Sequence, residues 1–160
     1  MVYQKKTISR TRPPLRKKPS TQKVLKFTDA SHKRRQFFEQ CKEYALQSHM
    51  KSKHCAVLEY NGKIIAFSAN QYGVDKTSFS VHAEQSVHKK FSKIQHKLKK
   101  RRKYNLWALR FSSADTEEAM NSKPCRNCTK FIKESMPYVS KVFYSWDEKY
   151  YVSEDPRDLK

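Results

Sequence analysis

Glycine is scarce in this sequence of 160 residues, which contains only Gly62 and Gly73. Two isolated glycines do not build the glycine-rich loop that wraps the phosphates of a nucleotide, so that class of site is excluded. Long apolar runs are missing as well, since no stretch approaches the ~20 apolar residues that a membrane-spanning helix needs. The N-terminal region also has no apolar segment typical of a secretory signal. We therefore expect a protein that makes no contact with a membrane.

Cysteine is sparse too, with four residues in the whole chain. Small secreted domains held together by disulfides are much richer in cysteine. Four irregularly spaced cysteines instead favour an intracellular, reducing compartment and a metal-binding or catalytic role. The sequence does not distinguish the cytoplasm from the nucleus.

Acidic residues are few, with 15 Asp and Glu against 35 Lys and Arg, so the formal net charge is +20. Residues 1–35 carry 12 cations and one anion, and residues 87–103 carry nine cations and no anion. The remaining segments are neutral and have the apolar content of a globular domain. This distribution excludes a uniformly charged disordered chain. It confines any attraction to phosphate groups to two segments.

The chain divides into three expected parts. Residues 1–30 contain three prolines among scattered basic residues and show no helical or strand period, which predicts a disordered basic arm. Such an arm is a solvated tail, a nucleic-acid contact, or a transit or nuclear-import signal. Residues 31–153 are expected to form the folded domain, and residues 154–160 a short C-terminal tail.

Hydrophobic periodicity predicts three helices and four to five strands. In chain order these are a helix over 31–50, strands over 55–60 and 63–69, a helix over 81–102, a strand over 104–111, a helix over 125–135, a strand over 139–144 and a further strand over 150–152. This order, α-β-β-α-β-α-β, predicts an α/β fold with a single mixed sheet covered by the helices. Asn61-Gly62 between two apolar runs is typical of a tight hairpin, because both turn residues take positive φ.

The helix expected over 81–102 is amphipathic. One stripe is apolar, and another face gathers lysines, since residues three or four apart share a face. The candidate nucleic-acid contacts in this segment are Lys89, Lys93, Lys97, Lys100 and Arg101. The alternative is a solvated face whose last cations stabilise the helix dipole.

Two short motifs carry residues suited to chemistry. His82-Ala83-Glu84 begins the second predicted helix, and Pro124-Cys125-Arg126-Asn127-Cys128 begins the third. Two cysteines at a helix start lie close together, and the helix dipole there is expected to lower the pKa of both thiols. One histidine and two cysteines leave the fourth tetrahedral position of a zinc ion for water, which is the pattern of a catalytic site. A glutamate two residues from the histidine can reach that water and transfer protons.

In this order the two motifs resemble the His-x-Glu and Pro-Cys-x-x-Cys signature of the zinc-dependent cytidine and deoxycytidylate deaminase superfamily, over residues 31–152. The resemblance implies one Zn²⁺ per chain, bound by His82, Cys125 and Cys128, with Glu84 as general acid and base. It also implies hydrolytic loss of ammonia from an amino-bearing base. The implied substrate-binding groups are the Asn70 side chain at the sugar, the Ala83 backbone N–H, and the Lys123 carbonyl near the amine.

Three interpretations of the substrate remain open. The first is cytosine in a free nucleoside or nucleotide. It is favoured because the connection over 146–149 is too short for a helix and makes a fifth strand antiparallel, as in the free-nucleoside branch that the chain resembles. The second is cytosine or adenine in RNA or single-stranded DNA, favoured by the charge. The third is a non-catalytic, zinc-bearing nucleic-acid-binding module, which the presence of Glu84 argues against. Superfamily members are often oligomers, so a homo-oligomer is an alternative to a monomer.

Overall fold

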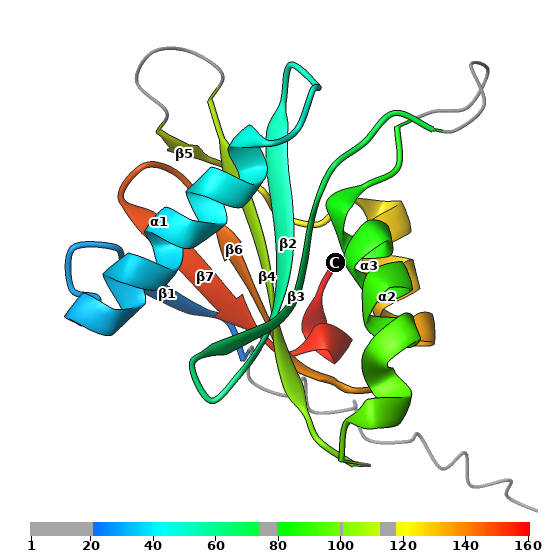
Figure 1. Ribbon diagram of the computed structural model, residues 1–160. Helices are drawn as coiled ribbons and strands as arrows, with labels where there is room; N and C mark the ends of the chain where they lie inside the picture. Colours follow the sequence, from blue (N-terminus) through cyan, green and yellow to red (C-terminus); the bar gives the residue numbers. More distant parts are fainter. Residues whose placement is uncertain (1–20, 74–79, 100, 113–117) are drawn as a thin grey trace, which may run out of the picture.

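The computed structural model describes residues 21–73, 80–99, 101–112 and 118–160, which form one sheet with helices on both faces (Figure 1). The strands are β1 (Lys23–Lys26), β2 (Lys53–Tyr60), β3 (Lys63–Ala69), β4 (Tyr104–Phe111), β5 (Ala119–Met120), β6 (Val139–Ser145) and β7 (Tyr150–Glu154). The helices are α1 (His32–Leu46), α2 (Ala83–Ile94) and α3 (Arg126–Ser135), with 3₁₀ turns at Gln95–Lys97 and Pro156–Asp158. No described helix has the length and apolar character needed to cross a membrane.

The sheet is mixed, as predicted. Its strand order is β1-β7-β6-β4-β2-β3, and the short β5 pairs with β4. Only the β4–β6 pair among these strands is parallel. β7 runs antiparallel to β6, as the short connection between them predicts. The predicted fold class is therefore confirmed, although the sheet has seven strands rather than four or five.

Two of the additional ordered segments lie at the chain ends. Residues 21–30, assigned to the disordered arm from the sequence, include β1, which pairs with β7. Residues 154–160, assigned to a tail, include Leu159, which is only 2% exposed. Thr21 Oγ1 donates a 2.7 Å hydrogen bond to Asp158 and so joins the two segments. All four β1 residues are exposed, so no apolar period marks this strand in the sequence. The rest of the predicted arm lies outside the described residues.

The predicted hairpin forms at Asn61-Gly62, where the φ angles are 50° and 78°. The first predicted helix is shorter than expected and ends at Leu46. Its start agrees with the prediction, since Ser31 Oγ accepts a 3.3 Å hydrogen bond from the Arg34 N–H. A polar side chain at this position satisfies a backbone N–H that has no partner within the helix.

The second predicted helix, expected over 81–102, ends at Ile94 and continues only as a 3₁₀ turn. Five consecutive cations, at 99–103, repel one another and oppose further helix. The backbone then takes a left-handed conformation at Arg101, with φ 69°, before β4 begins. Lys97 and Arg101 therefore do not share a helical face with Lys89 and Lys93, which corrects that prediction. Lys100 lies outside the described residues.

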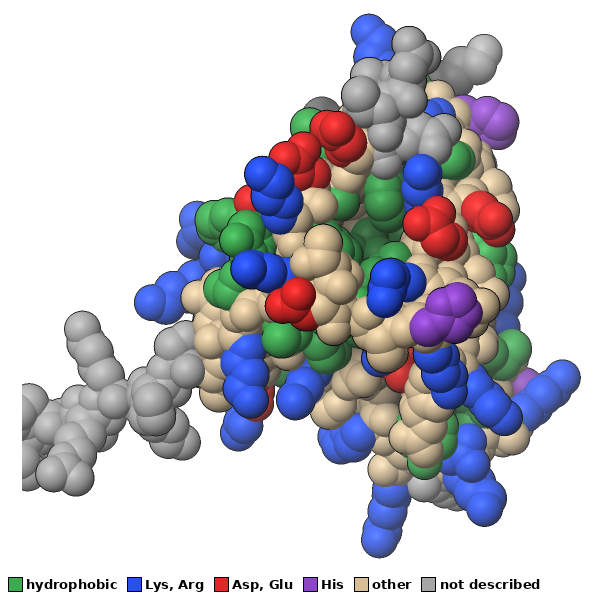
Figure 2. Space-filling model, turned by 90° about the vertical axis from the view of Figure 1, so that its left-hand side faces the viewer, with side chains coloured by type: hydrophobic (Ala, Val, Ile, Leu, Met, Phe, Trp, Pro, Cys, Tyr) green, Lys and Arg blue, Asp and Glu red, His purple; other side chains and the backbone are tan. Residues whose placement is uncertain are grey.

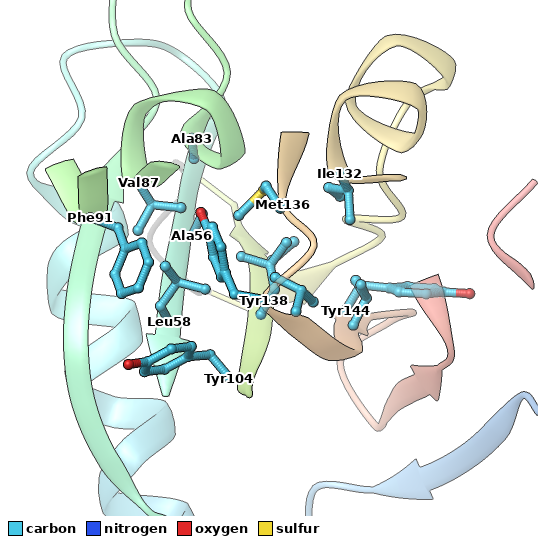
Figure 3. Packing of buried hydrophobic residues seen from close by; sticks show 14 of the residues in the cluster. Ala56, Leu58, Ala83, Val87, Phe91, Tyr104, Ile132, Met136, Tyr138 and Tyr144 are labelled. Carbon is cyan, nitrogen blue, oxygen red and sulfur yellow. The ribbon is translucent and has the colours of Figure 1, made fainter. Parts of the chain in front are cut away.

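Side chains of the central strands alternate between two cores, one on each face of the sheet. Ala56 and Leu58 of β2 pack with Val87 and Phe91 of α2, in the core that α3 completes (Figure 3). Val57, between them, packs on the other face in the core under α1. The sheet is thus covered on both faces. α2 and α3 lie on the same face and begin at the same end of the sheet (Figure 1). That end is where the two sequence motifs meet.

Candidate metal centre and active site

Two helix starts bring the three predicted metal ligands together. His82 is the N-cap residue of α2, and Cys125 is the N-cap residue of α3. Cys125 Sγ accepts a hydrogen bond from the Cys128 N–H at 3.4 Å, which fixes the first turn of α3. His82 Nδ1 lies 3.2 Å from Cys128 Sγ and 3.6 Å from Cys125 Sγ. The start of α3 thus brings Cys125 and Cys128 next to His82, which is more than 40 positions away in the sequence.

The donor set and its spacing fit zinc. All three ligand atoms lie within 4.8 Å of one another. Zinc–sulfur and zinc–nitrogen bonds of about 2.3 and 2.0 Å in tetrahedral geometry separate neighbouring ligand atoms by about 3.5 Å. The observed separations from His82 are close to that value. Cys128 is fully buried whereas His82 and Cys125 are exposed, so the centre is open on one side. Catalytic zinc sites leave one of four coordination positions free of protein ligands, and a set of three ligands does so here.

The prediction that the helix dipole lowers the pKa of both thiols is wrong for Cys128. Burial raises the pKa of this thiol well above its usual range, and the charges of Glu84 and Cys125 add to the effect. Desolvation and neighbouring negative groups outweigh the dipole. Without a metal ion the Cys128 thiol therefore keeps its proton at neutral pH. Binding of a cation must displace that proton.

Glu84 lies in the first turn of α2 and is only 8% exposed. Burial raises the pKa of its carboxyl, while its own backbone N–H, the charge of His82 and a hydrogen bond with Cys128 act in the opposite direction. Desolvation disfavours the charged form and is the larger effect. A carboxyl with a raised pKa is suited to taking up and returning a proton near neutral pH.

Glu84, His82 and Cys125 line one cavity of about 210 Å³, whereas the buried Cys128 does not line it. The residues that line it come from the ends of β2 and β3, the starts of α2 and α3, and the segments before them: Met50, Ser52, His54, Asn70, Ser80, His82, Ala83, Glu84, Ser122, Lys123 and Cys125. The structure thus places all three predicted substrate-binding residues, Asn70, Ala83 and Lys123, at the same cavity. Their roles toward a substrate remain predictions.

The Asn70 side chain is held by the protein itself. Its Oδ1 accepts from the His54 N–H at 3.0 Å, and its Nδ2 donates to the Ser52 carbonyl at 2.8 Å. Nδ2 also lies 3.2 Å from Met50 Sδ. Asn70 therefore fixes the entry of the chain into β2, in addition to any contact with a sugar.

His54 was not singled out from the sequence, although it lines the cavity. Burial, followed by the charges of Arg110 and His82, lowers the pKa of His54 to about 4, so its ring is neutral at neutral pH. Its Nε2 lies 2.9 Å from Ser52 Oγ. The strand period does contain the signal, because His54 shares the β2 face of Ala56 and Leu58. That face leads to α2 and the site.

Ser122 is a second residue that sequence reasoning missed. Its hydroxyl is buried, donates to the Ala108 carbonyl at 2.7 Å and lies 2.7 Å from Ser145 Oγ. These bonds fasten the segment before the Pro124 motif to β4 and β6. They set the position from which α3 begins. No local sequence pattern predicts a tertiary contact of this kind.

The predicted nucleic-acid contacts lie apart from this cavity. Lys89 and Lys93 are exposed on α2, while Lys97 and Arg101 follow its C-terminal end. None of the four lines the cavity. The structure therefore brings together the metal ligands, Glu84 and the substrate-binding candidates, but not the basic residues.

Comparisons with known proteins agree with this geometry. The model of a protein family described as the cytidine and deoxycytidylate deaminase zinc-binding region matches residues 31–146, more than two thirds of the chain. Among curated proteins there is no match.

Two solved structures of the dCMP deaminase from the cyanophage S-TIM5 are similar to the chain. The apo form has 20% sequence identity and a TM-score of 0.45, and the complex with dCMP and dUMP has 19% and 0.44. Both matches cover 69% of this chain and 79% of the other. From the family match, which spans both motifs and the elements that join them, the chain belongs to the cytidine and deoxycytidylate deaminase family of zinc-binding proteins.

Proposed function

We propose that this protein is a zinc-dependent hydrolytic deaminase that converts cytosine to uracil in a nucleotide. The observation that carries the proposal is the cluster of His82, Cys125 and Cys128 beside Glu84, with Glu84, His82 and Cys125 lining one cavity. A purely structural zinc site has no use for a buried carboxyl beside it. Membership of the family supports the reaction class.

His82, Cys125 and Cys128 would hold the zinc ion. A zinc ion with three protein ligands supplies Lewis acidity that brings the pKa of water near ~7. The overall reaction adds water to cytosine and releases ammonia, so protons must reach the ring nitrogen and the leaving amine. Glu84 is the titratable carboxyl positioned for both transfers, and its raised pKa favours the protonated form that donates.

The other residues that line the cavity would orient the substrate. The neutral ring of His54 offers a hydrogen-bonding edge without placing a second positive charge beside the metal. The Ala83 N–H and the Lys123 carbonyl would serve as backbone donor and acceptor. Asn70, already fixed by the start of β2, presents a preorganised wall to the sugar.

The position of Arg110 is an argument for a phosphorylated substrate. It is the cross-strand partner of His54, and opposed residues project from the same face of a sheet. Its Nε is buried and has no hydrogen-bond partner among the described residues. A buried guanidinium N–H without a partner is costly, and a phosphate oxygen would satisfy it. Arg110 does not itself line the cavity, but it lies beside His54, which does, and we therefore propose it for recognition of a phosphate group that extends from the cavity.

Deamination of cytosine or adenine within RNA or single-stranded DNA is the second candidate. It is favoured by Lys89 and Lys93, which are exposed on the helix that begins at the cavity. Positive side chains along a helix can follow the backbone of a strand. A non-catalytic nucleic-acid-binding module is a third candidate, and it requires that the protein release no ammonia.

The test is ammonia release by zinc-loaded protein from dCMP, CMP, deoxycytidine, and cytosine- or adenine-containing single-stranded RNA and DNA. We expect turnover of the monomers and a higher kcat/KM for dCMP than for deoxycytidine. Arg110→Gln should lower kcat/KM for dCMP about tenfold or more, because a charge-assisted hydrogen bond is lost, and leave deoxycytidine unaffected. Arg102→Gln, the same change in the segment before β4 and away from the cavity, is the control. Turnover of oligonucleotides alone would support the second candidate. Absence of ammonia from every substrate would refute deamination.

A further inference from the structure

A groove lies at the end of the molecule opposite the catalytic cavity. α2 begins beside the cavity at Ala83 and ends at Ile94, and 12 helical residues at about 1.5 Å each span about 18 Å. Past that end, the segment that leads into β4 and the Pro137-Tyr138 turn enclose a space of about 340 Å³. The α2–β4 connection lies at the lower end in Figure 1, whereas α2 and α3 begin at the upper end.

This groove is positively charged. Four of its lining residues are cations, Lys99, Arg101, Arg102 and Lys103, and no Asp or Glu lines it. Within the described ranges, none of the four forms an ion pair with a carboxylate. Figure 2 shows the molecule from the left-hand side of Figure 1. In this view too, Lys and Arg side chains project from the lower end of the molecule. The described carboxylates leave the positive potential at this groove uncompensated.

Two of the cations are held in place by contacts with uncharged groups and therefore keep their full charge. The Arg102 guanidinium lies 4.8 Å from the centre of the Tyr60 ring, and Lys103 Nζ donates to the Pro137 carbonyl at 2.7 Å. Arg101 takes a left-handed backbone conformation, which glycine or asparagine adopts more readily than arginine. Local stability therefore does not account for an arginine here, while charge in the groove does.

The groove continues into a second hollow of about 560 Å³, with which it shares Lys103 and Pro137. Lys133 and Arg157 line this second hollow, together with Asp155, which Arg157 pairs at 2.8 Å. A surface this long is better suited to an extended polyanion than to a single phosphate. The exposed large apolar residues of the described chain all lie outside residues 91–104 and 132–140, so this end lacks the apolar anchors of a membrane-binding surface.

We propose that the groove lined by Lys99, Arg101, Arg102 and Lys103 binds the phosphodiester backbone of a nucleic-acid strand, at a site separate from the catalytic cavity. Contacts of this kind go to phosphates and carry no base sequence. The strand is held to the protein by charge while the cavity remains free for a nucleotide. This site does not depend on the proposed reaction, because no residue of the groove lines the cavity.

The experiment measures binding of the full-length, zinc-loaded protein to a fluorescein-labelled single-stranded RNA by anisotropy over a range of salt concentrations. The test variant is Lys99→Gln/Arg101→Gln, and Arg101→Gly removes one of these two charges while relieving the left-handed backbone. The matched control is Lys130→Gln/Lys149→Gln, which removes two exposed cations elsewhere. All variants retain the basic residues 1–20, so a difference between them reports on the groove.

We expect the slope of log K against log salt to fall by about 1.4 in the test variant, since each single-strand phosphate contact contributes about 0.7. The control should keep its slope, and turnover of dCMP should be equal in all proteins. Equal losses of RNA binding in the test and control variants would show that binding follows net charge alone and would overturn the proposal that the groove binds RNA. Unchanged binding in the test variant would do the same. Displacement of the RNA by polyglutamate at equal charge concentration would assign the groove to an acidic protein partner instead.

Discussion

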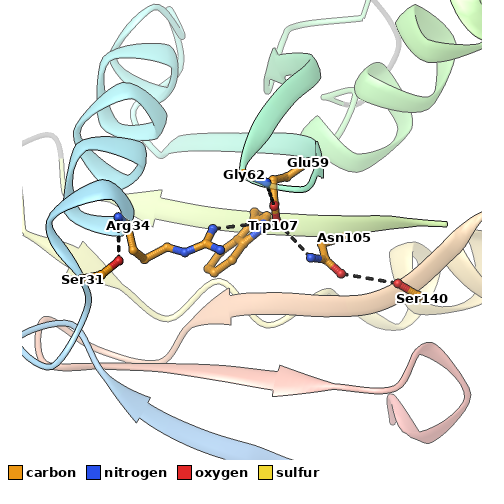
Figure 4. Close-up of polar contacts among 7 residues, drawn as sticks. All are labelled: Ser31, Arg34, Glu59, Gly62, Asn105, Trp107 and Ser140. Carbon is orange, nitrogen blue, oxygen red and sulfur yellow. Dashed lines mark hydrogen bonds and ion pairs between the residues drawn. The ribbon is translucent and has the colours of Figure 1, made fainter. Parts of the chain in front are cut away.

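The carboxylate of Glu59 lies 3.8 Å from the guanidinium of Arg34, beneath α1 and between the two central strands (Figure 4). The Glu59 carboxylate also accepts hydrogen bonds from the Gly62 N–H, Asn105 Nδ2 and Trp107 Nε1. The Arg34 guanidinium lies 4.7 Å from the centre of the Trp107 ring. One buried acid therefore connects α1, the hairpin turn and β4.

Replacing this acid should destabilise the fold in a pH-dependent way. Burial alone would raise the pKa of Glu59, but the bonds from Asn105, Gly62 and Trp107 and the charge of Arg34 hold it below its usual value. A lowered pKa stabilises the folded state above the unfolded-state pKa, and this contribution is lost as pH falls through the folded-state pKa. Glu59→Gln should lower the free energy of unfolding at pH 7 by about 2 kcal/mol, because it leaves the half-buried Arg34 without its counter-ion.

Urea unfolding of both proteins at pH 7 and pH 3 measures this effect. The difference between wild type and Glu59→Gln should shrink below pH ~4, where the unfolded-state carboxyl is protonated. Glu39→Gln, at an exposed acid on α1, is the control and should change stability little. A difference that stays constant with pH would contradict the assignment.

Zinc binding should release protons. Because the pKa of the Cys128 thiol is raised by burial and by Glu84, the metal-free protein holds this proton at neutral pH. Zinc affinity should therefore rise between pH 6 and pH 8, as metal binding requires the thiolate. Calorimetric titrations in buffers of different ionisation enthalpy measure the protons released. Cys128→Ala should lose the metal, whereas Cys41→Ala, on the buried face of α1, should retain it. Affinity that is independent of pH would show that Cys128 is not a ligand.

Glu84→Gln should separate metal binding from catalysis. The amide has the size of the acid but transfers no proton, so kcat should fall by about 10²–10⁴. Zinc content, measured by atomic emission, should remain one per chain. Glu134→Gln, exposed on α3, is the control and should keep full activity. A Glu84→Gln protein that turns over at the wild-type rate would remove this residue from the mechanism.

Asn70→Ala should reduce stability as well as activity. The substitution leaves the His54 N–H and the Ser52 carbonyl without their partner, which should cost about 2 kcal/mol. Thermal unfolding of the metal-loaded protein measures the loss. An unchanged melting temperature together with a raised KM would limit Asn70 to substrate binding.

Gly62→Ala tests the hairpin. A side chain at φ 78° is strained, and the added Cβ would lie 3.0 Å from Lys33 Nζ. Because the lysine end is flexible, the backbone strain dominates, and we expect a loss of about 1 kcal/mol. Asn61→Gly, at the preceding positive φ, should change the free energy of unfolding by less than about 0.5 kcal/mol. Equal effects of the two substitutions in denaturant titrations would contradict this account.

The sequence contains most of the local information in this protein. The apolar stripe of Ala83, Val87 and Phe91 predicts a helix with one buried face, and Asn61-Gly62 predicts a turn with two positive φ angles. The two motifs predict which residues meet at a metal ion. Each of these signals works because the chemistry depends on residues a few positions apart.

Other features depend on contacts between distant segments and leave no local pattern. β1 has no apolar period because its partner is the backbone of β7. α2 ends at Ile94, before the five cations at 99–103 that lead into β4. Tertiary packing buries Cys128 next to Glu84, which reverses the pKa shift expected from the helix dipole. The residue types and their local spacing thus specify the elements and the metal ligands. Burial and the approach of distant strands decide the protonation of the site and the separation of the basic groove from the cavity.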